Sequence, residues 1–308
     1  MRLLSIVISG GFCHSGGGMH NNGTTNNLTT ISLQLARAAS TAIMAIYRCD
    51  HIDITTKLDG SPVTAADMAA HDIFAKGLAQ HFPTIPLVSE EDFHPTQFPP
   101  VAGVRHGIDT PTMVDSYFLL DPVDGTREFI RKTGEFAINV GLVVAGRPVF
   151  GLIWHPPSDS GYSGGIDGVF FHRGDVATAV KPPAAVLDAD GDSGEHIKTN
   201  DGNAAPLNAA PLNIVVSPSD KNPYRFEKML QRKIDRISYR GSSLKFFSLF
   251  DGSANCYPRT APSYEWDIAA GDALLRGLGG RLITADNGRD MTYGKKGALN
   301  GHFIATIS

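Results

Sequence analysis

The segment Asp121-Pro122-Val123-Asp124-Gly125-Thr126 limits the possible folds of this chain more than any other segment. It follows a short apolar stretch that is predicted to be a strand. Pro122 forbids a regular helix there, and Gly125 permits a tight backbone turn. Such a turn can direct the carboxylates of Asp121 and Asp124, with the Val123 carbonyl, toward one point. Hard divalent cations prefer such all-oxygen ligand sets. The competing interpretation is an Asx turn that only closes a loop, and the segment alone leaves both open.

Further acids occupy similar positions along the chain. Glu90-Glu91-Asp92 follows the apolar strand 87–89, and Asp267 and Asp67 each lie near the start of a predicted helix. A run of loop acids is usually a solvated surface, and an acid at a helix start is usually a cap. The hydroxyl of Thr126 has a similar alternative, since it can simply close its turn.

The segment Gly241-Ser242-Ser243-Leu244-Lys245 is a junction between a loop and a predicted helix. Backbone amides at a helix N-terminus can bind an anion. The alternative is an ordinary serine N-cap, and the segment alone favours that alternative.

Helical and strand periodicities alternate from residue 31 onward, and this predicts a layered α/β fold. We expect residues 1–30 to form a disordered extension, because this Gly/Asn/Thr-rich stretch has little apolar surface to bury. An N-terminal α+β lobe over 31–180, carrying most metal ligands, is followed by a polar connection at 181–211 and a C-terminal α/β lobe over 212–308. A long Pro/Gly-rich loop at 94–115 is predicted to be a lid or a mobile insertion.

The main elements expected in the first lobe are helices over 31–48 and about 63–82, and strands over 87–89, 117–120, 136–144, 148–155 and 168–172. Those expected in the second lobe are strands over 213–217, 237–239, 254–258 and 281–285, and helices over 224–233, 242–250 and 267–278.

The composition of the chain limits the kinds of binding partner and the cellular environment that we expect. The net charge of -4 over 308 residues provides no basic field for nucleic acid. Three scattered cysteines suggest no disulfide framework, so we expect a reducing cytoplasm. The apolar run at the N-terminus is too short for a membrane span, and no other segment approaches the required length of about 20 residues.

Taken together and in order, these segments resemble the inositol monophosphatase superfamily of metal-dependent, lithium-sensitive phosphatases. The resemblance covers about Ile31 to the C-terminus. It rests on residues 57–67, 88–92, 120–129, 134–136, 241–245, 257–259 and 266–271. Within the superfamily, the Arg-Glu-Phe sequence at 127–129 and the Gly-Glu-Phe sequence at 134–136 are similar to the bisphosphate nucleotidase branch.

The resemblance implies an alternating α-β-α-β-α sandwich with metal ions between the two lobes. It assigns metal ligation to Glu90, Asp121, the Val123 carbonyl, Asp124 and Asp267, and activation of the attacking water to Asp67 and Thr126, with Glu90 also counted among the catalytic groups. The substrate phosphate would rest on the amides of Gly125 and Thr126, beside the metal ligands. Further nucleotide contacts are implied for Glu135, Gly241, Ser242, Lys245 and Arg259.

The implied reaction is magnesium-dependent hydrolysis of the 3'-phosphate of adenosine 3',5'-bisphosphate (PAP), or of its sulfated analogue (PAPS), in sulfur assimilation. Two or three Mg²⁺ ions are expected in the site, with Li⁺ and Ca²⁺ as inhibitors. The protein would be a cytoplasmic monomer or dimer, with peripheral association with the inner face of the plasma membrane as an alternative. The competing functions are an inositol monophosphatase or other sugar phosphatase, and a binding protein that no longer hydrolyses its nucleotide.

Overall fold

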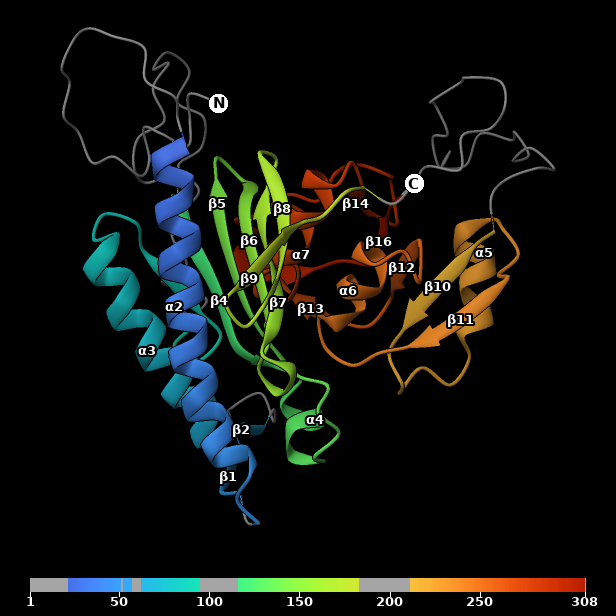
Figure 1. The fold of residues 1–308 in the computed structure, drawn as a ribbon. Helices are drawn as coiled ribbons and strands as arrows, with labels where there is room; N and C mark the ends of the chain where they lie inside the picture. The colour runs from blue at the N-terminus through green and yellow to red at the C-terminus, as the bar shows by residue number, and fades with distance from the viewer. Residues whose placement is uncertain (1–21, 51, 57–61, 95–115, 183–210, 308) are drawn as a thin grey trace, which may run out of the picture.

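The computed structural model describes residues 22–50, 52–56, 62–94, 116–182 and 211–307. Helices and sheets alternate in five layers, α-β-α-β-α, as the family resemblance implied (Figure 1). The outer helices α2 (Asn22–Tyr47) and α3 (Ala65–His81) cover one face of the first sheet, and α5 (Phe226–Leu230) covers the far face of the second. Helices α6 (Leu244–Phe250) and α7 (Glu265–Gly277) form the middle layer.

The first sheet has seven strands in the order β3-β4-β5-β6-β7-β8-β9. Only β3 and β4 pair in parallel, and the other neighbours are antiparallel. Their bounds are β3 (Leu87–Ser89), β4 (Ser116–Asp124), β5 (Ala137–Val144), β6 (Arg147–His155), β7 (Ser160–Gly165), β8 (Gly168–Arg173) and β9 (Val176–Ala179).

The second sheet has five strands in the order β11-β10-β12-β16-β14. They are β10 (Asn213–Val216), β11 (Arg236–Tyr239), β12 (Cys256–Arg259), β14 (Arg281–Thr284) and β16 (Phe303–Thr306). Short elements complete the fold: β1 (Ile54–Thr56), β2 (Pro62–Thr64), α4 (Thr126–Ile130), β13 (Ser263–Tyr264) and β15 (Leu299–Asn300), with short 3-10 turns at 156–158, 223–225 and 296–298.

Strand β4 is buried on both faces, which is why it reads as a continuous apolar run. Phe118 and Leu120 pack in the core formed with helices α2 and α3. Tyr117 and Leu119 point the other way, into the core shared with α6, α7 and the second sheet. Because successive side chains alternate, the next inward-pointing position is Asp121.

The first helix begins earlier than predicted. Helix α2 starts at Asn22 instead of residue 31, and Leu28 is fully buried against the first sheet layer. The expected disordered extension over 1–30 is therefore wrong for residues 22–30, because the apolar stripe of the helix continues into a polar stretch. Residues 1–21 lie outside the described part of the chain.

Several strands of the described regions escaped the sequence pattern. Strand β7 is built from Ser, Gly and Tyr and has almost no apolar periodicity. Its glycines are needed for close packing: a Cβ on Gly161 would lie 2.3 Å from the Ile153 carbonyl oxygen. Strands β9 and β16 were also missed, and the helix expected over 224–233 is confined to 226–230.

Most of the predicted insertion at 94–115 and of the polar connection at 181–211 lies outside the described residues. All strands of the first sheet precede that connection in the sequence, and all strands of the second sheet follow it. No helix among the described residues is both long and apolar enough to cross a membrane.

Candidate active site

A bulge in strand β4 brings Asp121 and Asp124 to the same face of the sheet. Asp121 lies opposite Asn139 of β5 and Asp124 lies opposite Ala137, so three steps along β4 match two along β5. Two residues three apart point to opposite faces of a regular strand, and one extra residue reverses that relation. Pro122, which lacks an N–H, sits inside the bulge. The bulge explains how the predicted acid pair converges.

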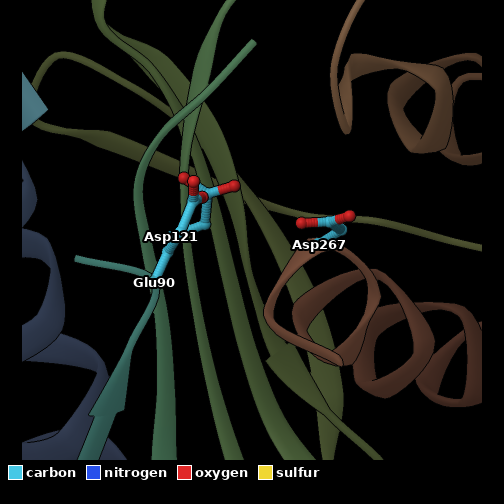
Figure 2. Close-up of side chains that lie close together, drawn as sticks. All are labelled: Glu90, Asp121 and Asp267. Atoms are coloured by element: carbon cyan, nitrogen blue, oxygen red, sulfur yellow. The ribbon is translucent and has the colours of Figure 1, made fainter. Parts of the chain in front are cut away.

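Glu90 and Asp267 complete an acidic cluster with Asp121. Glu90 follows β3, which runs parallel to β4, and its backbone N–H donates to the Leu120 carbonyl at 3.0 Å. Asp267 faces them from the first turn of α7 (Figure 2). Carboxylate oxygens of the three residues lie within 4.8 Å of one another. The structure thus joins three acids that are 31 to 177 positions apart in the sequence.

The electrostatics of this cluster are unfavourable without a cation. Burial, followed by the charges of Glu90 and Asp124, raises the pKa of Asp121 well above its usual value. Burial and Asp124 also raise the pKa of Asp267, to about 7, although Arg259 acts in the opposite direction. A bound dication would reverse both effects.

The donor atoms fit a hard divalent cation. The three carboxylates of the cluster offer only oxygen, and no His or Cys joins this group within the described residues. Oxygen-only sets suit Mg²⁺ or Ca²⁺, whereas zinc sites usually include nitrogen or sulfur ligands. The cluster can therefore hold the metal ions that the resemblance implies, at Glu90, Asp121 and Asp267.

Asp124 lies beside this cluster with one oxygen already bound. Its Oδ2 accepts hydrogen bonds from Ser242 Oγ at 3.0 Å, from Asn139 Nδ2 at 3.2 Å and from the Ser243 backbone N–H. Its charge still raises the pKa of both Asp121 and Asp267, which places it within electrostatic reach of the cluster.

The Asx-turn interpretation is also correct. The Val123 N–H donates to Asp121 Oδ1 at 3.1 Å, which is the local bond that such a turn makes. The Val123 carbonyl accepts from Thr126 Oγ1 at 3.3 Å. Turn closure and acid clustering thus occur in the same six residues, so the two interpretations do not exclude each other.

Asp67 and Thr126 form the predicted pair. Thr126 Oγ1 lies 3.4 Å from Asp67 Oδ1, across 59 positions of sequence, and its single proton can be donated to this oxygen or to the Val123 carbonyl. Asp67 is also a helix cap, because its Oδ2 accepts from the Thr64 N–H at 2.8 Å and from Thr64 Oγ1 at 2.6 Å. Asp267 is similar: it is the third residue of α7, not an N-cap, and accepts from the Tyr264 N–H at 2.9 Å. Capping fixes both carboxylates in place.

Gly125 is required by both its backbone and its surroundings. Its φ of 93° lies in the left-handed region, and a Cβ there would meet the Glu135 carbonyl oxygen at 2.9 Å. Glu135 Oε2 in turn accepts from the Gly241 N–H at 3.0 Å. The Gly-Glu-Phe and Gly-Ser-Ser segments therefore contact each other beside the turn at 121–126.

Lys245 and Arg259, the two basic residues predicted to contact the nucleotide, donate hydrogen bonds to neighbouring groups of the protein itself. Lys245 is 1% exposed, and its Nζ donates to the Ser242 carbonyl at 2.6 Å and the Arg240 carbonyl at 3.3 Å. Arg259 donates to the Pro262 carbonyl at 2.8 Å and to Tyr257 at 3.2 Å. Direct contact of either residue with a nucleotide stays a prediction.

Two residues that hold Asp124 were missed from the sequence. Asn139 and Ser243 are both buried and hydrogen-bonded to each other, Ser243 Oγ donating to Asn139 Oδ1 at 2.7 Å. The available signal was Asn139 itself, a polar residue within the otherwise apolar strand Ala137–Val144. For Ser243, its place in the Gly-Ser-Ser segment drew attention only to Ser242.

Comparison with known proteins gives consistent matches along the chain. The family model described as "Inositol monophosphatase family" matches residues 25–306. The 3'(2'),5'-bisphosphate nucleotidase CysQ of Escherichia coli strain K12 is 34% identical over 250 residues, covering 81% of this chain and 87% of that protein. CysQ of Salmonella typhimurium is also 34% identical, over 89% of this chain and 97% of its own length.

Solved structures agree in fold. The crystal structure of CysQ from Bacteroides thetaiotaomicron has a TM-score of 0.67 and 28% identity, covering 93% of this chain and 99% of that one. The suhB protein of Bartonella henselae has a TM-score of 0.60 at 20% identity, covering 92% of this chain and 94% of its own, which supports the fold alone.

Proposed function

The chain belongs to the inositol monophosphatase family, and on that premise we propose that it is a 3'(2'),5'-bisphosphate nucleotidase that removes the 3'-phosphate of PAP. The observation that carries this proposal is the bulged end of β4, where Asp121 joins Glu90 and Asp267 in one acidic cluster. The relatives named as bisphosphate nucleotidases extend over more than four fifths of the chain. The contact between Glu135 and Gly241 adds support, because it joins the two segments that resemble the nucleotidase branch.

Glu90, Asp121, Asp267 and the free oxygen of Asp124, with the Val123 carbonyl, would hold two or three Mg²⁺ ions. Such ions supply a water of lowered pKa and neutralise charge on the phosphoryl oxygens. Li⁺ and Ca²⁺ would inhibit by occupying the same ligands.

The chain's own groups position the reactants and move the proton. Thr126 Oγ1 lies between Asp67 and the metal-binding turn, so it can accept a proton from the attacking water while passing its own to Asp67 Oδ1. The amides of Gly125 and Thr126 stand at the start of α4 and would hold a phosphate oxygen. A bond forms between water oxygen and phosphorus, and the bond from phosphorus to the 3'-oxygen breaks. That oxygen takes a proton from solvent water and leaves as the 3'-hydroxyl of AMP, while the proton passed to Asp67 is released to solvent. PAPS would yield APS by the same step.

A place in sulfur assimilation, in the cytoplasm, follows from this substrate and from the cysteine content. Peripheral binding to the inner face of the plasma membrane, and a monomeric or dimeric state, belong to the same proposal and rest on the resemblance.

Phosphate release from PAP, inositol 1-phosphate and fructose 1,6-bisphosphate in Mg²⁺ tests the proposal. We expect PAP to be hydrolysed with the highest kcat/KM. Preference for a sugar phosphate would move the chain to another branch of the family. Tight binding of PAP without phosphate release in any metal would indicate a nucleotide-binding protein.

A further inference from the structure

The Asp124 carboxylate accepts hydrogen bonds from two parts of the chain, one in the first sheet and one next to the second sheet. Asn139 reaches its Oδ2 from strand β5 of the first sheet. Ser242 and Ser243 reach the same oxygen from the loop that joins β11 of the second sheet to helix α6. Among the described residues no donor bonds the other oxygen, Oδ1, although an ionised carboxylate has room for about four hydrogen bonds. The protein therefore uses the two oxygens of Asp124 unequally.

The orientation of Asn139 follows from its partners. Asn139 is fully buried and lies directly opposite Asp121 in the β4–β5 ladder. Because an ionised carboxylate only accepts hydrogen bonds, the amide nitrogen must face Asp124. The amide oxygen then faces Ser243 Oγ at 2.7 Å, and the Ser243 backbone N–H returns to Asp124. Asn139, Ser243 and Asp124 thus close a ring of hydrogen bonds through Oδ2 of Asp124.

The loop in this ring is held in a backbone conformation that serine rarely adopts. Ser242 has a φ of 56°, in the left-handed region, and such a conformation persists only where its surroundings enforce it. Here the enforcing contacts are the Asp124 carboxylate on the Ser242 side chain and Lys245 Nζ on the Ser242 carbonyl. The same carboxylate therefore fixes both the strand end and the loop.

We propose that Asn139 and Ser243 are positioning residues that commit Oδ2 of Asp124 to the protein, leave Oδ1 to the metal ion, and so tie metal binding to the geometry of the 241–243 loop. The inference rests on the metal site of the proposed function. Groups that orient a metal ligand typically change metal affinity or activity by about 10- to 100-fold when they are removed.

Titration of the purified full-length protein with Mn²⁺, followed by electron paramagnetic resonance, tests this without any substrate. Asn139→Leu should weaken Mn²⁺ binding by about 10- to 100-fold. The matched control is Asn255→Leu, because the Asn255 amide also makes two hydrogen bonds, to Asn213 and Pro211, but contacts no carboxylate. The control should bind Mn²⁺ like the wild type while its unfolding temperature falls.

Kinetics separate positioning from general damage. If Asn139 acts through metal affinity, kcat of Asn139→Leu toward PAP should recover as Mg²⁺ is raised, whereas a merely destabilised protein shows no such rescue. Should Asn139→Leu not fold, Ser243→Ala removes only the hydroxyl of the ring and should still weaken Mn²⁺ binding by about 10-fold, the lower end of that range.

Wild-type Mn²⁺ affinity in either folded variant would overturn the inference and leave the proposed function standing. Absence of Mn²⁺ binding by the wild-type protein would instead overturn the metal site, and this inference with it.

Discussion

Glu265 and Asp267 both lie on the first turn of helix α7, two residues apart, but their surroundings differ in charge. Glu265 is fully buried and accepts from the Gly294 N–H, the Lys295 N–H and Lys295 Nζ, each at 2.8 Å. Asp267 is partly buried, accepts one backbone hydrogen bond, and faces Glu90 and Asp121. The pKa of Asp267 is raised to about 7, by burial and by Asp124.

Burial of an acid is therefore a poor guide to function in this molecule. Glu265 is matched by donors and a cation, so it holds the segment at 294–295 to the helix. Asp267 is surrounded mainly by like charges, which costs stability unless a cation binds there. The comparison predicts that loss of Glu265 damages folding and that loss of Asp267 damages catalysis.

The largest effect is expected for Asp267→Asn. Metal ions contribute several kcal/mol of charge stabilisation in the transition state, so loss of one ligand should lower kcat/KM by about 10³-fold. At pH 8 in EDTA the variant should be at least as stable as the wild type, because a repelled charge is gone. Phosphate release from PAP and urea denaturation measure the two quantities. Wild-type turnover would show that Asp267 is not part of the catalytic site.

Thr126→Val tests Asp67, the other acid that caps a helix, by changing the hydroxyl that lies next to it. The substitution keeps the side-chain shape and removes the hydroxyl that donates to Asp67. Proton transfer by a positioned group contributes about 10²- to 10⁴-fold, so we expect kcat to fall by about 10²-fold or more with KM little changed. Thr126→Ser is the matched control and should keep most of the activity. Full activity of the valine variant would exclude the hydroxyl from proton transfer.

Glu265→Gln should show the opposite pattern from Asp267→Asn. Hydrogen bonds to charged groups contribute about 1.5–3 kcal/mol each, and the amide would replace an acceptor with a donor facing N–H groups. The free energy of unfolding should therefore fall by about that amount, while kcat in saturating Mg²⁺ stays near the wild-type value. A loss of turnover without a loss of stability would contradict the structural role assigned to Glu265.

The sequence was sufficient for the layers and for the identity of the clustered acids. Apolar runs such as residues 117–120 predicted buried strands, and the resemblance named the three acids that the structure brings into one cluster. What it could not supply was the bulge between Asp121 and Asp124, because that bulge exists only in the pairing with β5. Asn139 was missed for the same reason, since its meaning depends on the residue opposite.

The contacts of individual side chains were the second feature that the sequence alone could not predict. Lys245 was predicted to contact the nucleotide, and this stays a prediction. The sequence did not indicate that its side chain is buried and that its Nζ donates to the Ser242 carbonyl. Asp67 and Asp267 were weighed as caps or as catalytic groups, and they make capping bonds while also lying in the site. Local bonds and function share these residues, and only their long-range neighbours reveal the second role.

The smallest effect concerns the pH dependence of stability in EDTA. Asp267 has a folded pKa of about 7, above its ordinary value of 3.8, so the folded state holds a proton that the unfolded state has already released. The stability contribution is therefore present at low pH and is lost as pH rises through about 7. Between pH 6 and pH 8 the loss should be about 1.4 kcal/mol, the value of one pKa unit. Urea denaturation at both pH values should show a smaller loss in Asp267→Asn than in the wild type, because Asp121, whose pKa is also raised, remains in the variant, whereas Glu265→Gln should retain the full loss. An equal pH dependence in the wild type and Asp267→Asn would mean that the charge at this position is not repelled, and the contrast between the two acids of α7 would fail.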